Sequence, residues 1–192
     1  MLSVIIPTLD SERMLVPTLG TLVSGAATGT VRDVIIADGG SSDATLRIAD
    51  FAGCEILTSK APLGVRLRDA TAKAKASWVM FLRPGVVLDA AWVEEAGRFI
   101  GQAEMRGAPE AAAAVFRPVA GTERPLLLEA WSLVRLALSA KTAAEQGLIV
   151  SKVLYDQVGR HRDVNDPEKD LLTRIGRRRL TLLRSRAWTA DT

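Results

Sequence analysis

Short apolar runs alternate along the chain with longer stretches in which apolar residues recur every three or four positions. The runs lie at residues 2–6, 34–37, 55–58, 78–82 and 111–118, and each is too short for a helix, so they predict strands. The stretches at 15–22, 45–51, 65–76 and 90–105 have helical spacing. Strands that alternate with helices predict a parallel sheet, because a parallel pair needs a crossover. The expected fold class is therefore α/β.

Glycine, proline and charged residues mark where these elements end. The cluster of Gly and Thr at 25–30 is expected to stop the first helix, and Arg83, Pro84 and Gly85 interrupt the chain after the strand at 78–82. Residues 126–140 are apolar around most of a helical circumference, which predicts a buried helix, with a membrane or partner surface as the alternative. Because no internal repeat or linker is visible, we expect a single domain over residues 1–192.

The composition narrows the classes of partner and location. Of the 192 residues, 48% are hydrophobic and 24% charged, as in an ordinary globular protein. A net charge of +3 is too small, and an aromatic content of 5% too low, to predict a nucleic-acid partner. A single cysteine, Cys54, and an N-terminus without the pattern of a signal peptide favour the cytoplasm.

Positive charge is concentrated near the C-terminus. Residues 160–186 contain eight Arg and one Lys against four acidic residues. This segment either faces anions or forms a solvated basic tail, and the sequence supports both interpretations equally.

Most familiar catalytic motifs are absent. The sequence has no GxGxxG, GxxxxGK[ST] or HExxH, and its one histidine, His161, cannot form a histidine metal cluster. Carboxylates at the carboxyl ends of predicted strands remain, and in open α/β sheets ligands bind at that edge. Asp38 closes the strand at 34–37, and Gly39 and Gly40 allow a sharp turn that would aim its carboxylate into the crevice. In the alternative interpretation, Asp38 or Ser41 only caps the following helix.

Five segments, in order, resemble a known family. LSVIIPTLDSE, DVIIADGGSSDAT and WVMFLRPG are followed by AEQGLIVSKVLYDQVG at 144–159 and PEKDLLTRIGR at 167–177. Family 2 glycosyltransferases of the GT-A fold show similar segments, namely VIIPTLNEE, VVDGGSSDGT, FLHADT or FLDADD, GDQGLFVRR and EDVDLVRRLGR. This resemblance implies an open, mostly parallel, twisted sheet flanked by helices that transfers a sugar from a nucleotide diphosphate sugar to an acceptor hydroxyl. A generic α/β domain, in which the DGGSSD turn is only a helix cap, is the unrelated alternative.

The resemblance also assigns residues to a nucleotide-sugar site. It places Pro7, Thr8 and Asp10 on the first loop, and it places Asp38 and Gly39 against the base or ribose of a UDP or GDP sugar. A carboxylate suits that task because it accepts charge-assisted hydrogen bonds from hydroxyl or imide groups. Arg66 and Arg68 stand where the family has a contact to the nucleotide, although an exposed helix face explains them equally well. Asp43 is expected at a helix end instead.

Catalytic and acceptor roles are implied for residues near the C-terminus. Glu168 stands where the family has its catalytic Asp, and in an inverting transferase it would act as general base on the acceptor hydroxyl. Asp170 is either a substitute base or a helix-surface residue, and Pro167 replaces an expected Glu. Glu145 and Gln146 occupy the segment that would contact the acceptor, which is a glycan, a lipid-linked molecule or a small molecule. A homodimer and a peripheral membrane contact are compatible with the sequence.

One departure from the family concerns the metal. A GT-A enzyme normally holds Mg²⁺ or Mn²⁺ with the last Asp of a DxD-like motif, and here that motif reads Arg83-Pro84-Gly85. Three explanations follow. Arg83, with help from 177–179, replaces the charge of the metal; or the domain binds nucleotide or glycan without turnover, alone or with an active partner; or other acids, the substrate or a partner chain hold the metal.

Overall fold

A computed structural model describes residues 1–108, 112–119 and 147–190 of the chain. The first half contains β1 (Leu2–Thr8), α1 (Glu12–Ala27), β2 (Val31–Asp38), α2 (Thr45–Phe51), β3 (Glu55–Thr58), α3 (Leu63–Lys73), β4 (Trp78–Phe81), β5 (Val86–Leu88) and α4 (Trp92–Met105). The second half contains β6 (Ala113–Pro118), β7 (Leu148–Ser151), α7 (Lys152–Gln157), α8 (Pro167–Ile175), the short helix η3 (Arg177–Arg179) and β8 (Leu180–Thr189). The α/β fold class is confirmed.

The strands of the described part form one eight-stranded sheet in the order β3-β2-β1-β4-β7-β6-β8-β5. The four strands β3, β2, β1 and β4 are mutually parallel, as is the pair β6 and β8. The pairs β4 with β7, β6 with β7, and β5 with β8 are antiparallel. The parallel strands end at a common edge, because Thr8 is in register with Asp38 and Ile5 with Phe81.

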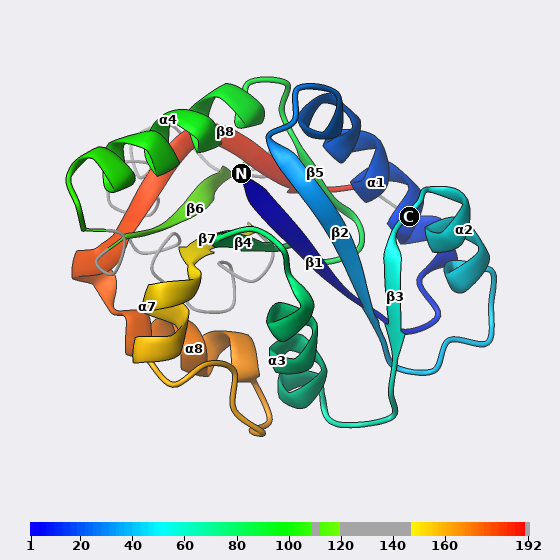
Figure 1. Ribbon diagram of the computed structural model, residues 1–192. Coiled ribbons are helices and arrows are strands. Elements are labelled where there is room, and N and C mark those ends of the chain that lie inside the picture. Colours follow the sequence, from blue (N-terminus) through cyan, green and yellow to red (C-terminus); the bar gives the residue numbers. More distant parts are fainter. Residues whose placement is uncertain (109–111, 120–146, 191–192) are drawn as a thin grey trace, which may run out of the picture.

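Helices cover both faces of the sheet (Figure 1). One buried cluster joins the sheet to α1 and α4, with Leu15, Leu22 and Trp92 among its members. The other joins the opposite face to α3, α7 and α8, and includes Leu67 and Leu171. Strands β1 and β4 are buried on both faces, as their continuous apolar sequences predict. None of the helices in the described part is long and apolar enough to cross a membrane.

The expected elements are present, with shifted ends. The first helix ends at Ala27, within the Gly and Thr cluster that was expected to stop it. Gly25 itself lies inside the helix and serves packing, since a Cβ there would lie 2.7 Å from the Trp92 ring and 2.8 Å from a Val31 methyl carbon. Strand β1 continues through Pro7, where β4 no longer pairs with it. The helix expected at 126–140 lies outside the described residues.

The C-terminal basic segment is not a solvated tail. It forms α8, η3 and β8, and β8 is a ten-residue strand between β6 and β5. The pattern that predicts a strand there, a buried residue at every second position from Leu183 to Ala187, is masked in the sequence by the arginines between them.

Candidate functional site

Asp38 lies at the carboxyl end of β2 with its side chain 0% exposed. Its Oδ1 accepts hydrogen bonds from Thr8 Oγ1 at 2.9 Å and Ser41 Oγ at 2.5 Å, and its Oδ2 accepts from the amides of Gly40 at 2.7 Å and Ser41 at 2.9 Å. Burial by itself would raise the pKa of Asp38, but these bonds, led by those from Ser41, lower it overall. The carboxylate is therefore ionised and turned to its own loop, which differs from the expected orientation into an open crevice.

The loop after β1 and the loop after β2 hold each other in place. Asp10, in the left-handed region at φ 45°, accepts from the Ser42 amide at 2.7 Å, and its own amide donates to Ser41 Oγ at 2.9 Å. Glu12 and Asp43 also link the two loops. The Glu12 amide donates to Asp43 Oδ2, and the amide of Ala44, next to Asp43, donates to Glu12 Oε2. Asp43 also accepts from the Thr45 amide at the start of α2, as expected of a helix-end acid. These contacts fix both loops at the sheet edge.

Arg66 reaches from α3 into the same loops. Its Nη1 donates to the carbonyl oxygens of Ala37 at 2.6 Å and Thr8 at 3.2 Å, while its buried Nε has no partner among the described residues. Burial lowers the pKa of Arg66, and the nearby Asp38 carboxylate opposes that effect. A side chain on Gly39 would press on this arginine, since a Cβ there would lie 3.3 Å from the guanidinium carbon. Pro7, Thr8, Asp38, Gly39 and Arg66 thus share one edge of the sheet.

Arg83 and Glu168 meet although 85 residues separate them in sequence. Arg83 follows β4, and Glu168 lies in the first turn of α8 with 6% exposure. Arg83 donates from Nε to Glu168 Oε2 at 2.9 Å, and its Nη2 forms a second short contact with the same oxygen. The pair lies at the same edge as Asp38, because β1, β2 and β4 are parallel and end there.

Asp170 is held by a different arginine. Arg174 donates to Asp170 Oδ2 from Nε at 3.0 Å and from Nη2 at 2.5 Å, and this contact lowers the pKa of Asp170. The same guanidinium donates to the carbonyl oxygens of Val158 and Arg160. Asp170 therefore links α8 to the preceding turn, which agrees with its interpretation as a helix residue and leaves Glu168 as the carboxylate beside Arg83.

The structure does not bring Arg68 to this edge. Arg68 lines a separate small cavity of about 120 Å³ between α3 and α7, together with Tyr155 and Lys152. Glu145 and Gln146 lie outside the described residues, so their expected acceptor role is not placed. The signal that separates Arg66 from Arg68 is their spacing, because side chains two positions apart on a helix do not share a face.

The residues at the DxD-like position do not fit a divalent cation. Gly85 has no carboxylate, its φ is +90°, and its amide donates to Met14 O and Thr18 Oγ1, both at 2.8 Å. Among the described residues, no group of three or more His, Cys, Asp or Glu is arranged to hold a metal ion. Arg83, the first residue of this motif, carries a guanidinium. That group supplies positive charge but cannot bind a cation.

Sequence reasoning missed two residues that place α8. Gly64, near the start of α3, packs against the backbone of Arg162, and a Cβ there would lie 1.9 Å from the Arg162 carbonyl oxygen. His161 is 1% exposed, and its Nδ1 lies 2.9 Å from the Tyr155 hydroxyl. His161 could have been singled out because it is the only histidine of the sequence. Nothing in the sequence distinguishes Gly64 from other helix glycines.

Comparison with known proteins gives one family and a set of similar folds. The profile described as "Glycosyl transferase family 2" matches residues 3–102. The structure of S. aureus TarS (residues 1–349) in complex with UDP is 17% identical, with a TM-score of 0.71, and the alignment covers 100% of this chain and 60% of that one. The chain therefore spans less than two thirds of the length of the TarS chain that it matches. No curated protein matches the sequence.

A second protein has a similar fold. Glucosyl-3-phosphoglycerate synthase from Mycobacterium tuberculosis, in complex with Mg²⁺ and UDP, is 17% identical with a TM-score of 0.70, covering 100% of this chain and 72% of that one. TarS has also been solved with UDP-GlcNAc, at 16% identity and a TM-score of 0.68 over 100% of this chain and 59% of that one. At such identities the likeness shows a shared fold alone, here the GT-A fold.

Proposed function

This chain belongs to glycosyl transferase family 2, and on that premise we propose that it transfers a sugar from a nucleoside diphosphate sugar to an acceptor hydroxyl. The observation that carries the proposal is the contact between Arg83 and Glu168 at the edge where β1, β2 and β4 end. Similar folds bind UDP or UDP-GlcNAc, which supports a nucleotide sugar as the donor. The acceptor class and a homodimer stay predictions from the sequence.

Glu168 is proposed as the general base of an inverting reaction. Its carboxylate accepts the proton of the acceptor hydroxyl while that oxygen forms a bond to the anomeric carbon. The bond from the anomeric carbon to the diphosphate oxygen breaks at the same time, and the nucleoside diphosphate leaves with the electron pair. Burial of Glu168 and its position in the first turn of α8 fix the carboxylate for this step.

Arg83 is proposed to stabilise the diphosphate. A guanidinium can bind two phosphate oxygens at once and remains charged at any physiological pH. Because Gly85 offers no carboxylate to a cation, no step of this mechanism passes through a metal ion. Arg83 then carries the positive charge that balances the leaving group, and arginines aimed at developing charge can contribute several kcal/mol, roughly as measured for other preorganised donors.

Asp38 is proposed to contact the base or ribose by exchanging one of its present hydrogen-bond donors for a group of the nucleotide. All four lone-pair positions of its carboxylate accept hydrogen bonds from the protein. A nucleotide hydroxyl or imide therefore reaches Asp38 only by replacing one of these donors. Two of them are side-chain hydroxyls, and that of Ser41 is the less buried, because Thr8 is only 2% exposed. The backbone of the Gly39–Ser41 turn and Arg66 would line the same site.

Nucleotide binding can be tested without knowing the acceptor. We expect UDP or GDP to raise the melting temperature without divalent metal, because a ligand at about 100 times its Kd stabilises the native state by roughly 2.7 kcal/mol. Arg83→Gln should abolish the metal-independent shift. The matched control is Arg98→Gln, which removes an arginine that also pairs with a glutamate, Glu94, but on an exposed helix face. If no nucleoside diphosphate raises the melting temperature, with or without Mn²⁺, the proposal fails.

Turnover tests the base separately. Glu168→Gln keeps an acceptor for Arg83 but cannot take up a proton, so nucleotide binding should persist while release of nucleoside diphosphate falls by roughly 10²- to 10⁴-fold. Transfer at the wild-type rate by this variant would show that Glu168 is not the base.

A non-catalytic nucleotide-binding domain is the second candidate. The specific observation in its favour is the ion pair itself, because Arg83 neutralises the carboxylate that would accept the proton. In that case the wild-type protein should bind nucleoside diphosphate but release none from any nucleotide sugar, with every acceptor tried.

A further inference from the structure

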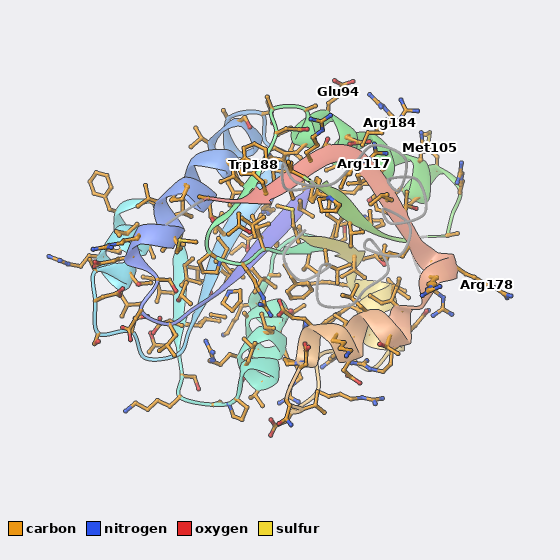
Figure 2. The ribbon with its side chains drawn as sticks, turned by 180° about the vertical axis from the view of Figure 1, so that it is seen from behind. Glu94, Met105, Arg117, Arg178, Arg184 and Trp188 are labelled. Atoms are coloured by element: carbon orange, nitrogen blue, oxygen red, sulfur yellow. The ribbon has the colours of Figure 1, made fainter. Side chains whose placement is uncertain are left out.

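Strand β8 has one buried and one exposed face. Leu183, Ser185 and Ala187 point inward and are buried, in the alternation typical of a strand. The exposed positions are Leu182, Arg184, Arg186 and Trp188, and on the neighbouring strand and just beyond it Arg117 and Val119 are also exposed. These six residues are called the arginine face. Figure 2 shows Arg117, Arg184 and Trp188 along β8, with Arg178 near its opposite end.

The arginine face carries three positive charges, of which that of Arg184 acts on the nearby Glu95 carboxylate. Arg117 and Arg186 are register partners on β6 and β8, so two like charges lie side by side, an arrangement that destabilises a sheet. None of the three arginines forms a salt bridge with a described residue. The exposed arginines of η3, residues 177–179, extend the charge toward the start of β8.

Acidic side chains lie close to this face, but they already have partners. Glu95 accepts from the amides of Arg184 and Ser185, and Asp89 accepts from the amide of Arg186 at 2.8 Å. Burial by itself would raise the pKa of Glu95, but the Ser185 hydroxyl, these amides and the charge of Arg184 lower it overall. Glu94 pairs with Arg98. The acids therefore fix the backbone of β8 and leave its guanidinium groups facing solvent.

Apolar side chains flank the arginines on the same face. Trp188 is 40% exposed, Val119 46% and Leu182 38%. A purely anionic polymer would gain binding energy from the arginines, but it would leave these three apolar side chains in contact with water. The boundary between lipid headgroups and acyl chains satisfies both, because indole and aliphatic groups bury there while guanidinium groups remain among the phosphates.

We propose that the arginine face is a docking surface for an anionic membrane. Arg117, Arg184 and Arg186 bind lipid phosphate, and Trp188 enters the headgroup region beside them. Contact through a rigid sheet face sets the orientation of the domain on the bilayer. The proposal rests on the charge and exposure of this face and not on the proposed reaction.

Vesicle flotation of the full chain tests this surface. Wild-type protein should bind vesicles of phosphatidylcholine with 30% phosphatidylglycerol, bind pure phosphatidylcholine at least tenfold more weakly, and lose binding as salt increases. The triple variant Arg117→Gln, Arg184→Gln, Arg186→Gln should bind the anionic vesicles about 100-fold more weakly. Its melting temperature should equal or exceed that of the wild type, because like-charge repulsion is removed.

A matched triple variant controls for net charge. Arg32→Gln, Arg47→Gln and Arg106→Gln remove three exposed arginines from other surfaces and should leave vesicle binding within about threefold of wild type. A second readout uses brominated lipids, which should quench tryptophan fluorescence in the wild type and much less in Trp188→Phe. Equal loss of binding in both triple variants would overturn the proposal. So would binding to soluble polyphosphate without binding to vesicles, which would indicate a polymeric ligand instead.

Discussion

At the end of β2, the four lone-pair positions of Asp38 accept hydrogen bonds from Thr8, Gly40 and Ser41. The residue therefore shapes the turn that follows it, whatever ligand the turn binds. Gly40 has a φ of +98°, which a side chain would strain, so the turn needs both the acid and the glycine. A single carboxylate at this position couples the stability of the loop to its ionisation.

Asp38→Asn should destabilise the protein by about 1–3 kcal/mol at pH 7, because an amide cannot accept all four bonds and places its own donors against backbone N–H groups. The native pKa of Asp38 is lowered from an ordinary value of 3.8, so its stabilising contribution is complete above that pH and lost as the pH falls below it. Urea unfolding at several pH values should therefore show the two proteins converging in acid. Asp50→Asn, on an exposed helix position, should show no such difference at pH 7.

Among the elements, α3 joins the two parts of the candidate site. One side of the helix carries Arg66 into the loops after β1 and β2, and its first turn packs at Gly64 against the segment that leads into α8. Arg174 fastens α8 to the preceding turn through the carbonyl oxygens of Val158 and Arg160. The position of Glu168 relative to Arg83 therefore depends on how closely α3 and α8 approach.

Gly64→Ala should test that dependence. The new Cβ would meet backbone atoms of Arg162, which cannot move aside as a flexible side chain can, so we expect a loss of about 1–3 kcal/mol in unfolding free energy. Nucleotide-dependent activity should fall further than stability explains, because α8 must shift. Gly97→Ala is the matched control: it lies in α4 with no atom within 4 Å of the new Cβ and should be neutral or stabilise by up to about 1 kcal/mol. Equal effects of the two substitutions would contradict the role given to Gly64.

At the scale of the whole molecule, a buried polar pair lies between the sheet and α8. The Tyr155 hydroxyl accepts from the His161 amide at 3.1 Å and lies 2.9 Å from His161 Nδ1, so the two side chains share a hydrogen bond inside the core. Phe81 of β4 packs edge-on against the imidazole at 4.7 Å between centroids. Burial first, and the charge of Arg174 second, lower the pKa of His161 from 6.5 to about 3, so the native ring is neutral.

The stability of the molecule should consequently depend on mildly acidic pH. The unfolded chain takes up a proton on His161 below pH 6.5 while the native state does not, so stability is complete above 6.5 and falls as the pH decreases toward 3. The slope from this one residue is at most about 1.4 kcal/mol per pH unit. His161→Gln should be less stable at pH 7 but should have a flatter profile between pH 6 and 4 in chemical denaturation. A parallel profile in the two proteins would contradict this assignment.

Much of the fold follows from local pattern. The apolar runs at β1, β2 and β4 and the helical spacing of α1, α2 and α3 predict the parallel part of the sheet, because residues buried on both faces can be recognised without knowing their partners. The strands β5, β7 and β8 were not predicted. They are short or carry arginines on an exposed face. Only their pairing, β7 with β4 and β6, β8 with β6, and β5 with β8, makes them strands.

The sequence by itself determined the family, the α/β class and the residues that stand at the carboxyl ends of the parallel strands, since these depend on the order of residues along the chain. Only the tertiary structure decided that Asp38 is enclosed by its own loop, that Arg66 and not Arg68 joins it, and that Arg83 contacts Glu168. The contacts of Arg66 and Arg83 join residues 29 and 85 positions apart, and their geometry depends on how α3 and α8 pack on the sheet, which no local pattern encodes. Most bonds of Asp38 are local, but the one from Thr8 requires β1 to pair with β2.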